Sequence, residues 1–109
     1  MKFKEPLLTP NPKRYSLFPI KDLEIWGKYK EAEASFWTAE EIDLSKDKED
    51  WDSLDNATRH WLKLVLAQFS QADNIVGENL VQNFSQEIQL PEAKSWFGMQ
   101  IAIENIHAE

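Results

Sequence analysis

The longest hydrophobic pattern in the chain lies between residues 56 and 87. Apolar side chains recur there every three or four positions along one face, which is the period of an α-helix. The stretch holds no proline and a single glycine, Gly77. The recurring face consists of Leu62, Leu66, Phe69, Asp73, Val76 and Leu80. The pattern predicts one long helix with a carboxylate, that of Asp73, in an otherwise apolar seam.

A second long helix is predicted after the polar stretch QEIQL at residues 86–90. Pro91 suits the first turn of a helix, where its missing N–H would have no partner in any case. The apolar residues Trp96, Phe97, Ile101 and Ile103 follow and carry the pattern to the end of the sequence. Because the connection around residues 86–91 is short, the two long helices should be antiparallel neighbours.

Shorter elements are predicted before the long helices. A helix from about Asp22 to Ala34 would place Leu23, Trp26 and Tyr29 on one side. Thr38 and Glu41 have the spacing of a capping box, which predicts a helical turn at TAEEI. The charged stretch DLSKDKEDWDSL that follows has room for another short helix.

The first twenty residues differ from the rest because they are rich in proline. Pro6, Pro10, Pro12 and Pro19 exclude a helix and favour an extended arm. Apolar side chains are interleaved with them, which predicts that the arm lies on a partner surface; they are Leu7, Leu8, Tyr15, Leu17, Phe18 and Ile20.

Taken together, these patterns predict an all-α fold. No segment alternates as a strand would, and no internal repeat is present. We expect an extended Pro-rich arm at residues 1–20, followed at residues 21–109 by short helices and two long antiparallel helices.

Composition and charge narrow the classes of function. The chain of 109 residues has a net charge of −7, so it does not attract nucleic-acid phosphates. It has no cysteine, which excludes disulfides, thiolate metal sites and cysteine nucleophiles. No apolar run approaches the about 20 residues of a membrane span, and the first residues do not resemble a signal peptide. We therefore expect a soluble, cytoplasmic protein with no nucleic-acid or membrane partner.

Asp73 is the first candidate for chemistry. An ionised carboxylate among apolar side chains is costly unless it is paired or binds a metal. Taken alone, however, Asp73 favours a simpler interpretation, in which it lies at the rim of the seam and contacts water or a basic side chain.

Glu104 and His107 change that balance. They are three residues apart, so they project from one face of the second long helix and can share a metal ion. Such a Glu-x-x-His pair is a weak signal alone, because a surface glutamate and a hydrogen-bonded histidine would give the same pattern. Its conjunction with a lone carboxylate one helix earlier is more specific. Four-helix di-iron proteins take one carboxylate from each of two helices and Glu-x-x-His from each of the other two.

The residues present would make half of such a site. Oxygen and imidazole ligands without thiolates favour iron, with manganese as the alternative. We predict that Asp73, Glu104 and His107 converge on one metal position.

Nearly the whole chain resembles the small (β) subunit of eukaryotic-type class I ribonucleotide reductase. The resemblance is carried by EPLLTPNPKRYSLFPIKDLEIW, YKEAEASFWTAEEIDLSKD, SQADNIVGENLVQNFSQEIQ and QIAIENIH. It implies a ferritin-like helical bundle in which Asp73, Glu104 and His107 are iron ligands. It also implies that Trp37 relays an electron and a proton between the di-iron site and the surface.

In that family, ferrous iron and dioxygen react to generate a tyrosyl radical, which is passed to a cysteine of the large subunit and initiates deoxyribonucleotide synthesis. The resemblance thus implies two partners, the large subunit and a second small subunit. The family's radical tyrosine follows the histidine by four residues, at position 111, beyond Glu109. We therefore expect residues 1–109 alone to form no radical, to bind metal weakly and to expose apolar helix faces.

Two alternatives remain at this point. Another ferritin-like di-iron protein, such as an oxidase, desaturase or ferroxidase, would share the ligand pattern but not the Pro-rich arm or the segment FWTAEEIDLSKD. In a non-enzymatic helical interaction module, Asp73, Glu104 and His107 would be merely structural.

Overall fold

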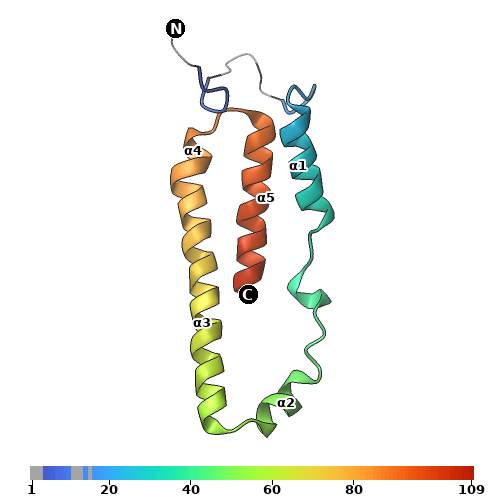
Figure 1. The fold of residues 1–109 in the computed structure, drawn as a ribbon. Helices are drawn as coiled ribbons and strands as arrows, with labels where there is room; N and C mark the ends of the chain where they lie inside the picture. The colour runs from blue at the N-terminus through green and yellow to red at the C-terminus, as the bar shows by residue number, and fades with distance from the viewer. Residues whose placement is uncertain (1–3, 11–13, 15) are drawn as a thin grey trace.

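The structure is a computed structural model that describes residues 4–10, 14 and 16–109. The described residues are helical and contain no strand, which confirms the all-α prediction (Figure 1). The helices are α1 (Leu23–Ala34), α2 (Asp47–Ser53), α3 (Asn56–Asn79), α4 (Ser85–Glu87) and α5 (Pro91–Ala108), with a 3-10 turn at Ala39–Glu41 and a π-helical segment at Leu80–Phe84.

Helix α5 lies between α3 and α1, and both pack against it. Helices α3 and α5 are antiparallel, as the short connection predicted, whereas α1 runs in the same direction as α5 (Figure 1). The predicted metal ligands therefore lie on neighbouring helices, with Asp73 on α3 and both Glu104 and His107 on α5.

The long helix predicted at residues 56–87 consists of three consecutive helical parts. The Asp55 carboxylate caps its start by accepting from the Thr58 N–H at 2.6 Å. After Asn79 the backbone passes through the π-helical segment and continues into α4. The hydrophobic period did not indicate this change of helix type, because a π turn alters the register by one residue without a Pro or Gly to mark it.

The predicted apolar seam of α3 is not packed in this structure. Leu66, Phe69 and Val76 are 61%, 64% and 44% exposed. The reason is that α5 covers a neighbouring face of α3, the one that carries Ser70 and Gly77. Asp73 therefore has exposed apolar neighbours and is itself partly exposed, as expected for a carboxylate at the rim of the seam. The expected exposure of apolar helix faces is confirmed.

The short elements follow the sequence closely. Asp22 is the N-cap of α1 and accepts from the Ile25 N–H at 3.0 Å. The Glu41 carboxylate accepts from the Thr38 N–H at 2.9 Å, as a capping box requires. The charged stretch after it forms α2. Local capping chemistry thus sets the helix starts.

The described part of the proline-rich arm contacts this chain's own residues at and before the start of α5, and its predicted contact with a partner surface stays a prediction. The Leu7 carbonyl accepts from the Gln89 N–H at 2.7 Å, and Arg14 pairs with Glu92 at the start of α5. Residues 6–8 form a turn, so this part of the arm is not fully extended. Pro12 and Tyr15 lie outside the described residues.

The molecule is elongated and its interior is small. Its radius of gyration is 19.4 Å, compared with about 13 Å for a compact domain of this length. Among the described residues only Gly77, Ile88, Glu92 and Ala93 are buried. None of the described helices has the length and hydropathy to span a membrane. The helices thus form an open layer, and its few buried residues lie around the start of α5 and at Gly77, where α3 approaches α5.

Candidate metal centre

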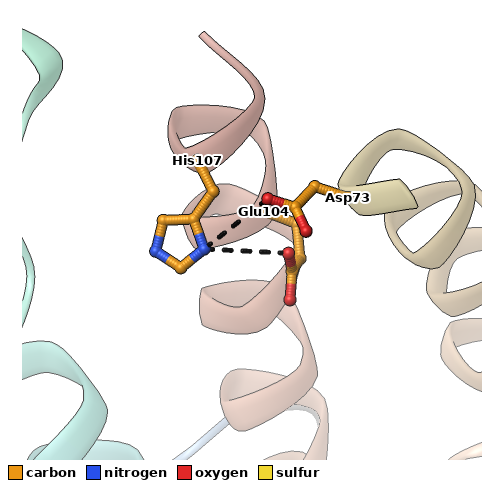
Figure 2. A group of neighbouring side chains, drawn as sticks. All are labelled: Asp73, Glu104 and His107. Carbon is orange, nitrogen blue, oxygen red and sulfur yellow. Dashed lines mark ion pairs between the residues drawn. The ribbon is translucent and has the colours of Figure 1, made fainter. Parts of the chain in front are cut away.

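Asp73, Glu104 and His107 come together where α3 and α5 lie side by side (Figure 2). One ligand atom from each residue can be chosen so that all three lie within 4.8 Å of one another. The His107 Nδ1 is 3.8 Å from the Glu104 Oε2 and 3.9 Å from the Asp73 Oδ2. Ligand atoms that share a metal at about 2.1 Å lie about 3–4 Å apart. The three side chains therefore converge as predicted, with a spacing suited to a cation.

Two contacts that the sequence did not reveal fix the position of Asp73 relative to α5. One turn before it, the Ser70 hydroxyl donates to the Ala108 carbonyl at 2.9 Å. About one turn after it, Gly77 faces Glu104, whose Cβ would lie 3.9 Å from a Cβ added to the glycine. A hydrogen bond and a close backbone approach thus bracket the carboxylate and hold it beside the ligands on α5.

The three side chains are partly accessible to water. Their exposed fractions are 31% for Asp73, 19% for Glu104 and 38% for His107. Two carboxylates facing one imidazole make the local field negative, which attracts a cation. The residues therefore favour a metal by their charge and arrangement, not by the burial of a carboxylate in an apolar seam.

Trp37 lies directly against this cluster. Its indole ring stacks on the His107 ring with the centroids 5.3 Å apart and the planes 22° from parallel. It comes from the segment between α1 and the 3-10 turn, which lines a pocket with Ile103 and Ile106 of α5. The chain therefore brings together all four residues that the sequence singled out, although only the resemblance pointed to Trp37.

Residues 14–109 match the family model described as ribonucleotide reductase, small chain. The chain belongs to this family. It is 58% identical over 106 residues to the ribonucleoside-diphosphate reductase small chain of Trypanosoma brucei brucei, a match that covers 97% of this chain and 32% of that protein. It is 57% identical over 106 residues to subunit M2 of the same enzyme in Danio rerio, covering 97% and 28%.

A solved structure shares the fold of this small-chain family member. The structure of the ribonucleotide reductase Rnr4 homodimer from Saccharomyces cerevisiae matches with a TM-score of 0.79 and 48% identity. The match covers 94% of this chain and 32% of that one. The expected all-α, ferritin-like fold class is confirmed. The chain spans about a third or less of the length of these relatives.

The most buried polar group among the described residues was not identified from the sequence. Glu92 in the first turn of α5 is 0% exposed. Its carboxylate accepts from the Arg14 guanidinium, at 2.9 Å for the Nη1, and from the Lys21 backbone N–H at 2.9 Å. Arg14 also donates to the carbonyls of Leu17 and Pro19. The only sequence signal for Glu92 is that acidic residues are favoured in the first turn of a helix. That preference is too common to identify one residue as a buried ion-pair partner.

The pKa of Glu92 predicts how this ion pair responds to acid. Burial raises the pKa, but hydrogen bonds from the Arg14 side chain and the Lys21 N–H outweigh burial and lower it from 4.5 to about 2. Because the folded pKa is the lower one, the ion pair contributes fully above pH 4.5, and its contribution is lost as the pH falls towards 2. Urea denaturation at a series of pH values should therefore show a steeper loss of unfolding free energy in the wild-type chain than in Glu92→Gln. Equal slopes would show that Glu92 has no depressed pKa.

Proposed function

We propose that the chain is the N-terminal part of a ribonucleoside-diphosphate reductase small subunit. In the whole subunit, Asp73, Glu104 and His107 would hold part of a di-iron centre, which would supply the oxidation of a tyrosine to a radical that the large subunit would use to make deoxyribonucleotides. The observation that carries the proposal is the convergence of Asp73, Glu104 and His107 within 4.8 Å in a chain of this family.

The donor set fits iron. It consists of two carboxylates and one imidazole, and the sequence has no cysteine that would favour zinc or an iron–sulfur cluster. Oxygen and imidazole donors also suit manganese, which remains the alternative metal. When bound, the iron supplies the dioxygen chemistry that oxidises a tyrosine.

The chain's own residues have distinct parts in this proposal. Asp73 and Glu104 would provide the negative charge that offsets the charge of the metal. Both carboxylates lie near the His107 Nδ1, so the three groups could bind the same ion (Figure 2). The His107 ring must be neutral at that nitrogen to act as a ligand, so metal binding releases a proton if the ring is charged beforehand.

Trp37 is proposed to carry the radical between the metal site and the surface. Its ring stacks on the His107 ring, and the residue as a whole is 37% exposed, so Trp37 contacts a proposed ligand and also reaches solvent. An aromatic ring in contact with a ligand offers a short path for an electron.

The remaining ligands are proposed to come from later helices of a longer chain, because three groups cannot hold two metal ions. By itself, residues 1–109 should bind metal weakly and form no radical. We further propose that the whole subunit pairs with a second copy, as the yeast neighbour does in its homodimer, that it acts with a large subunit, and that it resides in the cytoplasm.

Reconstitution of the full-length protein tests this function. The protein is loaded with ferrous iron, exposed to dioxygen and examined by electron paramagnetic resonance, and is then assayed with a large subunit. We expect a tyrosyl radical signal and deoxyribonucleotide formation. A Trp37→Phe variant is the matched control, which should load iron normally but have a much lower, still measurable turnover. An iron-loaded protein with neither radical nor turnover would instead indicate another ferritin-like oxidase.

A further inference from the structure

One buried carboxylate joins three segments of the chain. Glu92 lies in the first turn of α5, accepts from Arg14 of the arm, and accepts from the Lys21 N–H directly before α1. The side chains of Arg14 and Glu92 are 5% and 0% exposed, so water does not compete for these bonds. Glu92 therefore ties the entry of α1 to the start of α5.

Helices α1 and α5 leave this point side by side and in the same direction (Figure 1). With a rise of about 1.5 Å per residue, the 12 residues of α1 extend about 18 Å. His107 follows Glu92 by 15 residues, or about 22 Å along α5. Residues 35–37 follow α1 and make up the difference between these two lengths. Trp37 therefore lies beside His107, and the two rings stack. The position of Trp37 therefore depends on where α1 starts along α5.

The hydrogen bonds that fix the start of α1 along α5 all involve Glu92. Within the described residues, every hydrogen bond between residues 14–41 and α5 has Glu92 as its acceptor. The α1–α5 contact also includes apolar side chains, among them Ile25 and Trp96, which line a shared pocket. Apolar packing is non-directional, so it resists a small slide of one helix along the other less than a hydrogen-bonded anchor does.

We propose that Glu92, together with Arg14, is a positioning residue that sets the register of α1 along α5 and thereby holds Trp37 against His107. The value of this arrangement for radical transfer rests on the role of Trp37 under the proposed function. The anchor itself is a structural claim that can be tested without iron.

The first test measures the Trp37–His107 stack in the metal-free full-length protein. An indole stacked on an imidazole shifts the imidazole ring protons upfield, so the His107 signal in a histidine-labelled sample, assigned by its loss in His107→Ala, reports the contact. We expect Glu92→Gln to reduce the upfield shift, and Trp37→Leu, which removes the indole, should reduce it as well. The control Glu31→Gln, which alters an exposed ion pair with Lys28 on α1, should leave it unchanged. An unchanged shift in a folded Glu92→Gln protein would overturn the proposal.

Glu92→Gln leaves the buried Arg14 charge without its partner and can prevent folding, so Arg14→Gln/Glu92→Gln is the second variant. It removes both charges and should likewise lose the upfield shift. A folded double variant with the wild-type shift would overturn the proposal by itself.

The second test separates the anchor from the proposed function. In the iron-loaded protein with its large subunit, Glu92→Gln should lower turnover more than it lowers iron content. In a Trp37→Phe background the same substitution should have little further effect on turnover, because the anchor acts through Trp37. Independent, multiplicative losses would contradict the positioning role. If Glu92→Gln loses the Trp37–His107 stack but keeps normal turnover, the positioning role of Glu92 is supported and the proposed radical-transfer role of Trp37 is contradicted.

Discussion

Replacing His107 with alanine should lower the iron affinity of the full-length protein by at least about 100-fold, since even indirect changes around a metal cost 10–100-fold. The His107 Nδ1 lies near both carboxylates, so the substitution removes the only nitrogen ligand of the proposed three-residue site. Iron content after dialysis against a competing chelator measures the effect. His60→Ala is the matched control, because this exposed histidine lies in the first part of α3, away from the site.

Asp73→Asn extends the same prediction to the other helix. The amide keeps the shape of the side chain but removes its charge, so we expect a large loss of iron with little change in helix content by circular dichroism. Wild-type iron content in both His107→Ala and Asp73→Asn would mean that the metal binds elsewhere.

Replacing Glu92 with alanine should lower the free energy of unfolding by about 3–5 kcal/mol, the usual cost of breaking a buried ion pair from one side. The Arg14 side chain, which is 5% exposed in the intact pair, would lose its carboxylate partner, and the Lys21 N–H would lose its acceptor. Chemical denaturation followed by circular dichroism measures the change. Glu31→Ala is the control, since its exposed pair with Lys28 should contribute less than about 1 kcal/mol.

The two variants also test how the arm is attached. In Glu92→Ala the first residues should become more sensitive to proteolysis, because Arg14 holds the arm at the start of α5. If Glu92→Ala and Glu31→Ala lower the free energy of unfolding equally and are cleaved at the same rate, the buried ion pair does not attach the arm to α5.

Much of the fold was predictable because its signals are local. Helical periodicity, Pro91 at a helix start and the capping box that begins at Thr38 act within a few residues, and each appears in the structure. The packed face of α3 was not predictable in the same way. Periodicity identifies an apolar stripe but not which neighbour covers it, and α5 instead packs on the face of Ser70 and Gly77.

The candidate site was only partly predictable from the residues. The spacing of Glu104 and His107 places both on one helix face, and a lone carboxylate on the preceding helix suggested their partner. Trp37 came from the family resemblance alone, because no local pattern connects it with a histidine 70 positions later. Glu92 was missed for the same reason, since its partner Arg14 is 78 residues away.

The most direct test of the account is to locate the metal. Crystals of the iron-loaded full-length protein, measured at the iron absorption edge, would give an anomalous difference peak for each ion. We predict a peak about 2.0–2.3 Å from the His107 Nδ1 and from one oxygen each of Asp73 and Glu104, in line with usual ligand distances. A peak remote from these three atoms, or an Asp73 carboxylate turned to solvent beside an occupied site, would contradict the account.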